Sequence, residues 1–153
     1  MAQSYYTVGI HNVGSYQVSG KPWITGSRGM RGLQEQKVEF PYITKSITVI
    51  ATTIPSNGQM RIHFASTSSA CLGGASPCAA SNALVWAEEH YVPLCATSAS
   101  FTFDTKCKEI YISTLEGDAA TNTYDYTVVA ELTHIPIERM YPLTGSGLTE
   151  RSS

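Results

Sequence analysis

The stretch Val38–Ser66, VEFPYITKSITVIATTIPSNGQMRIHFAS, decides the fold class. Apolar residues recur there at every second position, and these are Ile47, Val49 and Ala51, then Met60, Ile62 and Phe64. This period, with its β-branched residues, predicts strands that place one face on a core. Between the two sets, Pro55-Ser56-Asn57-Gly58 predicts a turn, because Pro fixes φ and Asn-Gly tolerates positive φ. The stretch therefore predicts a β-hairpin with one buried face.

The rest of the chain continues in short strands separated by turn signals. Further strands are predicted at residues 36–40, Leu84–Trp86, Glu89–Leu94, Ser100–Asp104, Cys107–Ser113 and Tyr124–Thr133. The small-residue stretch Cys71–Ser81 and the polar stretch Gly117–Asn122 are predicted surface loops. About eight strands at such spacing predict an all-β fold, an antiparallel β-sandwich. A single jelly roll is the first interpretation, and an immunoglobulin-like sandwich is the second.

Three regions are predicted: an N-terminal arm and loop segment at 1–36, the β-sandwich at 37–133, and a C-terminal arm at 134–153. The 153 residues suffice for one domain with a real core. The predicted core residues are Ile47, Val49, Met60, Ile62, Phe64, Phe101, Phe103, Ile110, Ile112, Val128 and Leu132. The Gly and Pro content of both end regions discourages independent packing there.

Charged residues make up only 14% of the chain, against about 25% in a typical soluble domain. Nine Tyr, four Phe and two Trp indicate an ordered chain over most of its length. Such a surface suits a protein that works outside a cell or is covered by neighbouring subunits. The net charge of −2 gives no general attraction to nucleic acid or anionic lipid. The basic, Gly-rich segment 19–36 lacks interleaved aromatic residues, so we expect no nucleic-acid partner.

The chain shows no signal for a membrane or for secretion. No apolar run has the length that a bilayer span requires, so no membrane partner is expected. The stretch Met1–Tyr6 lacks both the basic region and the apolar region of a secretory signal. We therefore expect synthesis in a host cytoplasm, with any export by another route, such as assembly into a particle released by lysis.

Four cysteines, Cys71, Cys78, Cys95 and Cys107, do not have the spacing of a zinc site. No metal or other cofactor is therefore expected. Cys71 and Cys78 flank the small-residue loop, and both a disulfide between them and free thiols remain open. Cys107 is expected to pack as a small apolar residue.

No catalytic residues are predicted, and the chain is not expected to be an enzyme. Its four histidines, His11, His63, His90 and His134, are scattered and form no metal-binding or nucleophile motif. His63 alternates with an apolar row and is expected on the surface or at an interface. The carboxylates of Glu88, Glu89 and Asp118 are interpreted as solvated turn residues, although a glycosidase pair would need such groups.

Aromatic and apolar residues are concentrated in the two ends of the chain. The candidate interface residues are Tyr5, Tyr6, Tyr16, Trp23, Met140, Tyr141 and Leu143. Protein interfaces concentrate Tyr and Trp, and sugar-binding modules use the same rings as stacking platforms. Terminal segments make poor rigid platforms but good wrapping elements, which favours a protein interface.

Three segments carry a resemblance: GIHNVGSYQVSGKPWITGS at Gly9–Ser27, SFTFDTKCKEIYIS at Ser100–Ser113, and VAELTHIPIERMYPLTGSGLTE at Val129–Glu150. Together they resemble small virion structural proteins of tailed phages and large DNA viruses from aquatic environments. The resemblance implies a capsid-associated β-sandwich located in the virion, as a penton, minor capsid or decoration protein. It also implies a homo-oligomer that contacts other capsid proteins. The alternative function is a carbohydrate- or receptor-binding module, such as a fibre-tip domain.

Overall fold

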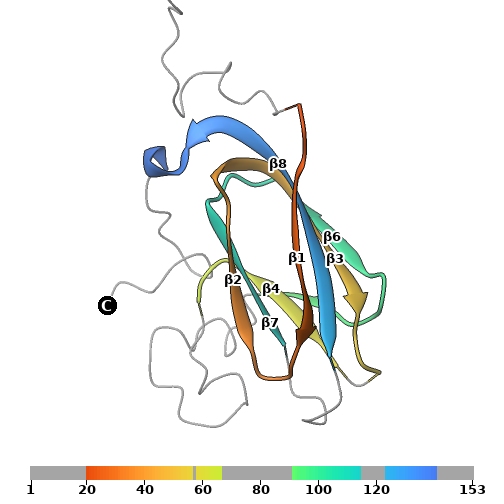
Figure 1. Cartoon of the computed structure of the whole chain (residues 1–153). Helices are drawn as coiled ribbons and strands as arrows, with labels where there is room; N and C mark the ends of the chain where they lie inside the picture. Colours follow the sequence, from red (N-terminus) through yellow and green to blue (C-terminus); the bar gives the residue numbers. More distant parts are fainter. Residues whose placement is uncertain (1–19, 57, 67–90, 115–122, 141–153) are drawn as a thin grey trace, which may run out of the picture.

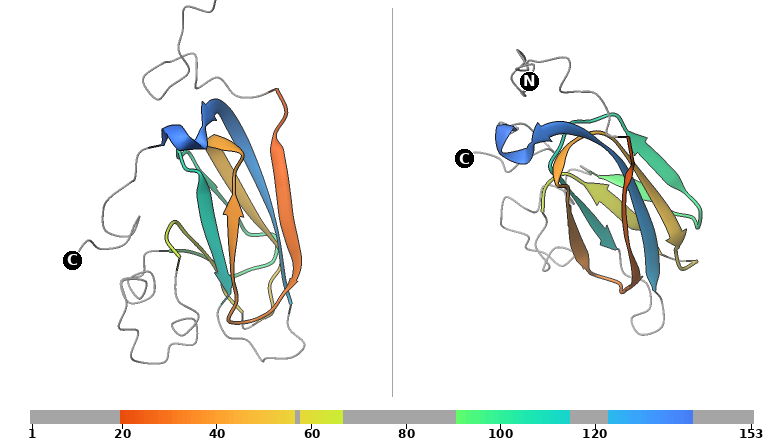
Figure 2. Two further views of the ribbon diagram at one scale, coloured as in Figure 1. Left: turned by 60° about the vertical axis from the view of Figure 1, so that its left-hand side comes forward. Right: turned by 45° about the horizontal axis from the view of Figure 1, so that its top comes forward.

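The structure, a computed structural model, describes residues 20–56, 58–66, 91–114 and 123–140. Within these ranges the chain forms eight strands and one turn of 3-10 helix, Ile137–Arg139. The strands are β1 (Trp23–Met30), β2 (Glu35–Glu39), β3 (Tyr42–Thr53), β4 (Met60–His63), β5 (Val92–Leu94), β6 (Ser100–Phe103), β7 (Glu109–Thr114) and β8 (Tyr124–Pro136). They form two four-stranded sheets that face one another (Figures 1 and 2). The predicted all-β sandwich is therefore confirmed.

The order of the strands follows a nested pattern. The first sheet has the order β1-β8-β3-β6 and the second the order β2-β7-β4-β5. Every neighbouring pair is antiparallel. The pairs β4–β5, β3–β6, β2–β7 and β1–β8 lie one inside the next along the chain. The described chain thus folds back on itself between β4 and β5, as one long hairpin would, and the pairs β3–β8 and β4–β7 complete the sheets.

The core lies between the sheets and follows the period of the strands. On β3, the side chains of Ile47, Val49 and Ala51 are fully buried, while the residues between them are half-buried. The same alternation runs along β8, where burial raises the pKa of Tyr126 to about 12. The Tyr126 hydroxyl donates a hydrogen bond of 2.7 Å to Gln36 Oε1 on β2, which satisfies a polar group inside the sandwich.

Most of the predicted core is confirmed. The buried members are Ile47, Val49, Met60, Ile62, Ile110, Ile112, Val128 and Leu132. Phe64 and Phe103 are only half-buried against this core, and Phe101 is 43% exposed, so its assignment to the core is wrong. Phe101 and Phe103 do lie opposite Val49 and Ile47 on the inner face. However, β6 is the last strand of its sheet, and no further described strand covers its rim.

The hairpin predicted within Val38–Ser66 is wrong, although both of its strands exist. Strand β3 pairs with β6 and β8, whereas β4 pairs with β5 and β7 in the other sheet. The predicted turn connects the two sheets instead, and Gly58 N donates to Pro55 O at 2.8 Å. Between β3 and β4 the chain therefore passes from one sheet to the other, and packed sheets are about 10 Å apart. A strand with apolar residues on one face has the same sequence pattern whether its neighbour along the chain pairs with it or faces it across the core. The pattern therefore does not identify the partner strand.

Both predicted domain boundaries are corrected. Strand β1 and the start of β2 belong to the sandwich, although both fall within the predicted arm 1–36. Strand β8 extends past residue 133 to Pro136, and Ile135 is fully buried. The glycines of β1 led to the prediction of a loop, but Gly29 occupies a bulge at φ +73°. The predicted strand Leu84–Trp86 and loops Cys71–Ser81 and Gly117–Asn122 lie outside the described residues, as do residues 1–19 and 141–153.

Replacing Gly26 with Ala should lower the free energy of unfolding by about 1–3 kcal/mol. A Cβ atom at this position of β1 would lie 2.5 Å from Tyr126 O, a backbone atom that moves only if β8 moves. Gly20→Ala is the matched control, because a Cβ there meets nothing within 4 Å. Urea denaturation measures both variants. Equal stability of the two would contradict the close approach of β1 to β8.

Candidate functional site

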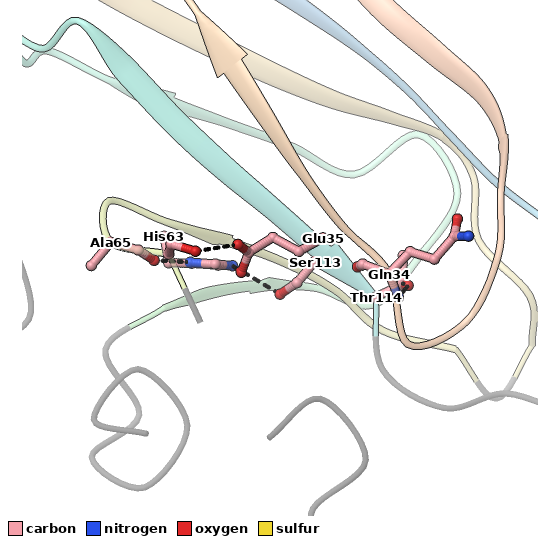
Figure 3. A network of polar contacts seen from close by, with 7 residues as sticks. Gln34, Glu35, His63, Ala65, Ser113 and Thr114 are labelled. Atoms are coloured by element: carbon pink, nitrogen blue, oxygen red, sulfur yellow. Dashed lines mark hydrogen bonds and ion pairs between the residues drawn. The ribbon is translucent and has the colours of Figure 1, made fainter. Parts of the chain in front are cut away.

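The second sheet carries a buried polar network on its outer face (Figure 3). His63 on β4 lies opposite Tyr111 on β7, and its side chain therefore points away from the core. Its neighbours in the next row are Ser113, Arg61 and, on β2, Glu35, which lie opposite one another across three strands. His63 and Ser113 are nonetheless fully buried, and Arg61 is nearly so. The prediction of His63 at the surface is therefore wrong.

Hydrogen bonds fix the tautomer of His63. Its Nδ1 lies 2.6 Å from Ala65 O, and a carbonyl only accepts, so Nδ1 carries the hydrogen. The Nε2 atom of the neutral ring then accepts from the Ser113 hydroxyl at 2.9 Å. Glu35 Oε2 is 3.7 Å from Nε2, which is too far for a hydrogen bond. Tyr111 stacks beside the imidazole with ring centroids 5.9 Å apart.

Burial lowers the pKa of His63 to about 4. The Ala65 carbonyl acts in the opposite direction, since it stabilises a protonated ring, and the nearby Arg61 charge adds a further lowering. His63 is therefore neutral at neutral pH. Burial acts most strongly because the imidazolium would lose its hydration, and the Glu35 carboxylate lies beyond hydrogen-bond distance of Nε2.

The neighbours of His63 are tied to the same face by their own contacts. Glu35 Oε1 accepts a hydrogen bond from the Ser66 hydroxyl at 2.7 Å. Arg61 Nε donates to Gln59 Oε1 at 2.5 Å, and its guanidinium lies 4.1 Å from the centre of the Tyr91 ring. The first contact links β2 to the residues after β4, and the contacts of Arg61 link β4 to Tyr91, which precedes β5. These contacts hold the outer face of the second sheet together. The alternation of residues predicted which face His63 takes, but nothing in the sequence indicates that this face is covered.

The Ser113–His63 pair has the composition of a nucleophile with its base, but its geometry favours a structural role. A nucleophilic serine must reach a substrate carbonyl, whereas Ser113 has no exposed surface. The pair instead joins β7 to β4 by a side-chain hydrogen bond next to the backbone ladder. Glu88, Glu89 and Asp118 lie outside the described residues.

The cysteines fall into different environments. Cys107 is buried as predicted, and burial raises the pKa of its thiol to about 11. Cys95 is exposed, and both of these thiols are free. Cys71 and Cys78 lie outside the described residues, so the two alternatives for them stay open. Across the part of the chain that the structure describes, no group of three or more His, Cys, Asp or Glu side chains is placed to hold a metal ion.

Two of the candidate interface residues are described, and both pack on the core of their own domain. Trp23 on β1 is half-buried and meets Phe40 edge to face, with ring centroids 5.2 Å apart. Met140, which follows the 3-10 helix, is also half-buried against the core. Both side chains are thus covered in part by the sandwich itself, and their role at an interface stays a prediction. Tyr5, Tyr6, Tyr16, Tyr141 and Leu143 lie outside the described residues, and their role stays a prediction.

The outer face of the first sheet carries two rows without charge, which we call the uncharged face. One row consists of Ile24, Val129, Thr48 and Thr102, and the other of Gly26, Thr127, Ile50 and Ser100. All eight positions are exposed or half-buried. The Thr48 and Thr102 hydroxyls bond to each other at 2.8 Å. These two hydroxyls can thus lose water at little cost, because they are already hydrogen-bonded to each other.

Carboxylates flank the uncharged face at its two ends. Glu131 Oε2 accepts from the Ser46 hydroxyl at 3.0 Å on one side. Asp125 accepts from Gly29 N at 2.7 Å and from the Thr53 hydroxyl at 3.2 Å on the other. The uncharged face thus has a neutral centre and a charged rim.

Comparison with known proteins does not add a family to these observations. No known protein family matches the chain, and no curated protein is similar to it in sequence. Among the described residues, no helix has the length and apolar character that crossing a membrane requires.

Proposed function

We propose that the chain is a virion structural protein, a capsid-associated subunit that assembles with copies of itself and with a major capsid protein. Its place in the virion would be that of a penton, minor capsid or decoration protein. We also propose that the sandwich is a single jelly roll, in which a long hairpin of eight strands is wound into two sheets. The nested pairs β1–β8, β2–β7, β3–β6 and β4–β5 support this topology.

The uncharged face is the main support for the assembly function. It exposes Ile24 at 62% and combines it with Val129 and Ile50 over neighbouring strands. Protein interfaces are depleted of charge at their centre and keep charge at the rim. A chain with only 14% charged residues is suited to such contacts on more than one side.

The jelly roll by itself is shared by capsid proteins, lectins and cupins, so the function depends on the surfaces available. Aliphatic side chains fill the space between the sheets, including Ile47, Ile62 and Ile112. Partners therefore meet this domain on its outer faces and strand edges. Subunits of a shell meet their neighbours on such outer faces and edges, and this favours the proposed structural function.

Particles purified from the source of the chain provide the test. We expect the protein to sediment with intact particles at a fixed ratio to the major shell protein. It should also resist a wash with about 1 M salt, because screening weakens contacts between charges but not apolar ones. Protein that stays at the top of the gradient, or that salt releases, would contradict a structural role in the shell.

The alternative, a carbohydrate-binding module, is favoured by one local feature. The ring of Phe101 is 43% exposed and rests on Phe103, with ring centroids 4.6 Å apart. Phe103 in turn meets Phe64 edge to face at 5.3 Å. An exposed ring held in this way could stack on a sugar. Two results together would establish the alternative. The protein would bind a specific glycan and lose this binding in Phe101→Ala, and it would not sediment with particles.

A further inference from the structure

Strand edges attract other strands unless something protects them, and the four edges of this sandwich differ in protection. Strand β5 has only three residues, and Pro93 is one of them. Strand β6 has four residues. Both edges are thus too short to guide a long partner strand, and Pro93 lacks the backbone N–H that pairing needs.

Strand β2 protects its edge with charge. Its five residues alternate Glu35, Lys37 and Glu39 on the outer face. Lys37 Nζ lies 2.7 Å from Glu39 Oε1 and 2.9 Å from Glu109 Oε2, so the charges are held on the rim of the sheet. A strand docking on this edge would have to remove water from that cluster.

Strand β1 has none of these protections over most of its length. It has eight residues, WITGSRGM, and the first charged residue is Arg28. It also contains no proline, and its bulge lies near its end, between Ser27 and Met30. Ile24, at 62% exposed, lies on this strand at the margin of the uncharged face. Among the described edges, β1 is therefore the one suited to receive another strand.

We infer that β1 pairs antiparallel with β1 of a second copy of this chain, so that the first sheets of the two copies become one continuous sheet. This inference rests on the proposed self-assembly and names its contact. Antiparallel pairing centred on Gly26 places Ser27 opposite Thr25 of the second copy and Arg28, where the bulge begins, next to Ile24, which keeps the two guanidinium groups apart. The contact uses the same strand on both copies and therefore closes after two subunits. The uncharged face then extends across the two-fold axis.

Sedimentation equilibrium of the full chain tests this pairing with two lysine variants. Ile24→Lys places a charge on the β1 edge, whereas Ser100→Lys places one on the same face of the sheet but on β6. Both positions are exposed, so both variants should fold, which circular dichroism verifies. We expect a dimer for the unmodified chain, a dissociation constant raised at least about tenfold in Ile24→Lys, and no change in Ser100→Lys.

Hydrogen exchange of the unmodified chain gives a second readout that needs no variant. Backbone amides of β1 that point away from β8 should exchange slowly at high concentration and rapidly on dilution. Slow exchange at a concentration at which sedimentation finds a single chain would mean that the chain's own residues cover the edge, and it would overturn the inference. A dimer or larger oligomer that Ile24→Lys leaves intact would also overturn it, while the proposed assembly function would stand. A monomer at all concentrations would overturn both.

Discussion

Replacing Ile112 with Ala is expected to lower the free energy of unfolding by about 2–5 kcal/mol. Ile112 is fully buried on β7 and lies opposite Ile62, which is fully buried on β4. The shorter side chain would leave a cavity between the two sheets, since close-packed strands on both sides restrict collapse around it. Urea denaturation followed by tryptophan fluorescence measures the loss.

Ile24→Ala, measured at a concentration at which sedimentation finds a single chain, is the matched control for this prediction, because it makes the same change on the outer face. Ile24 is 62% exposed, so its truncation should change stability by no more than about 0.5 kcal/mol. If both variants lost the same stability, the inward and outward faces of the strands would be assigned wrongly. A shift of one residue in register has that consequence for every side chain of a strand.

Stability should fall as the pH is lowered from about 6.5 to about 4, because His63 is buried in its neutral form. Its pKa is about 4 in the folded chain, against 6.5 for an unperturbed histidine. Between these values the unfolded chain binds the proton and the folded chain does not, so acid favours unfolding. The stabilisation is complete above pH 6.5 and is lost progressively down to pH 4. The full loss is about 3 kcal/mol at 1.36 kcal/mol per unit of pKa.

Two variants separate His63 from other titrating groups. His63→Gln removes the proton-binding ring, so the slope of stability against pH should flatten between pH 4 and 6.5 even though the variant is less stable. His134→Gln is the matched control, because it makes the same substitution at an exposed position of β8. If the slope in the His63 variant matched that of the unmodified chain, the pKa of His63 would be the same in the folded and the unfolded chain, and the neutral, buried assignment would be wrong.

The period of the sequence predicted the faces of the strands well. Ile47, Val49, Ile110 and Ile112 are all buried where alternation placed them. Alternation is a local property, and each strand keeps it whichever strands lie beside it. The same property explains the error at Phe101, since the inward direction was right but the burial of an edge strand depends on what lies next to it.

The pairing of the strands could not be read from the sequence. The turn at Pro55–Gly58 looks like a hairpin turn, yet it connects the two sheets, because the choice of partner depends on contacts far apart along the chain. Strand β1 was missed because Gly26 and Gly29 are typical of loops, whereas here they permit close approach and a bulge. The burial of His63 does not follow from its place in the sequence, because its contacts with Tyr111, Ser113 and Glu35 come from other strands.

The solution mass of the full chain as a function of its concentration tests the central claim most directly. A subunit built for assembly should show a mass that rises with concentration from one chain to a defined multiple of it. The change should persist in high salt, because the uncharged face contributes apolar contacts rather than ion pairs. A mass that stays at one chain over the whole accessible range of concentration would contradict the account.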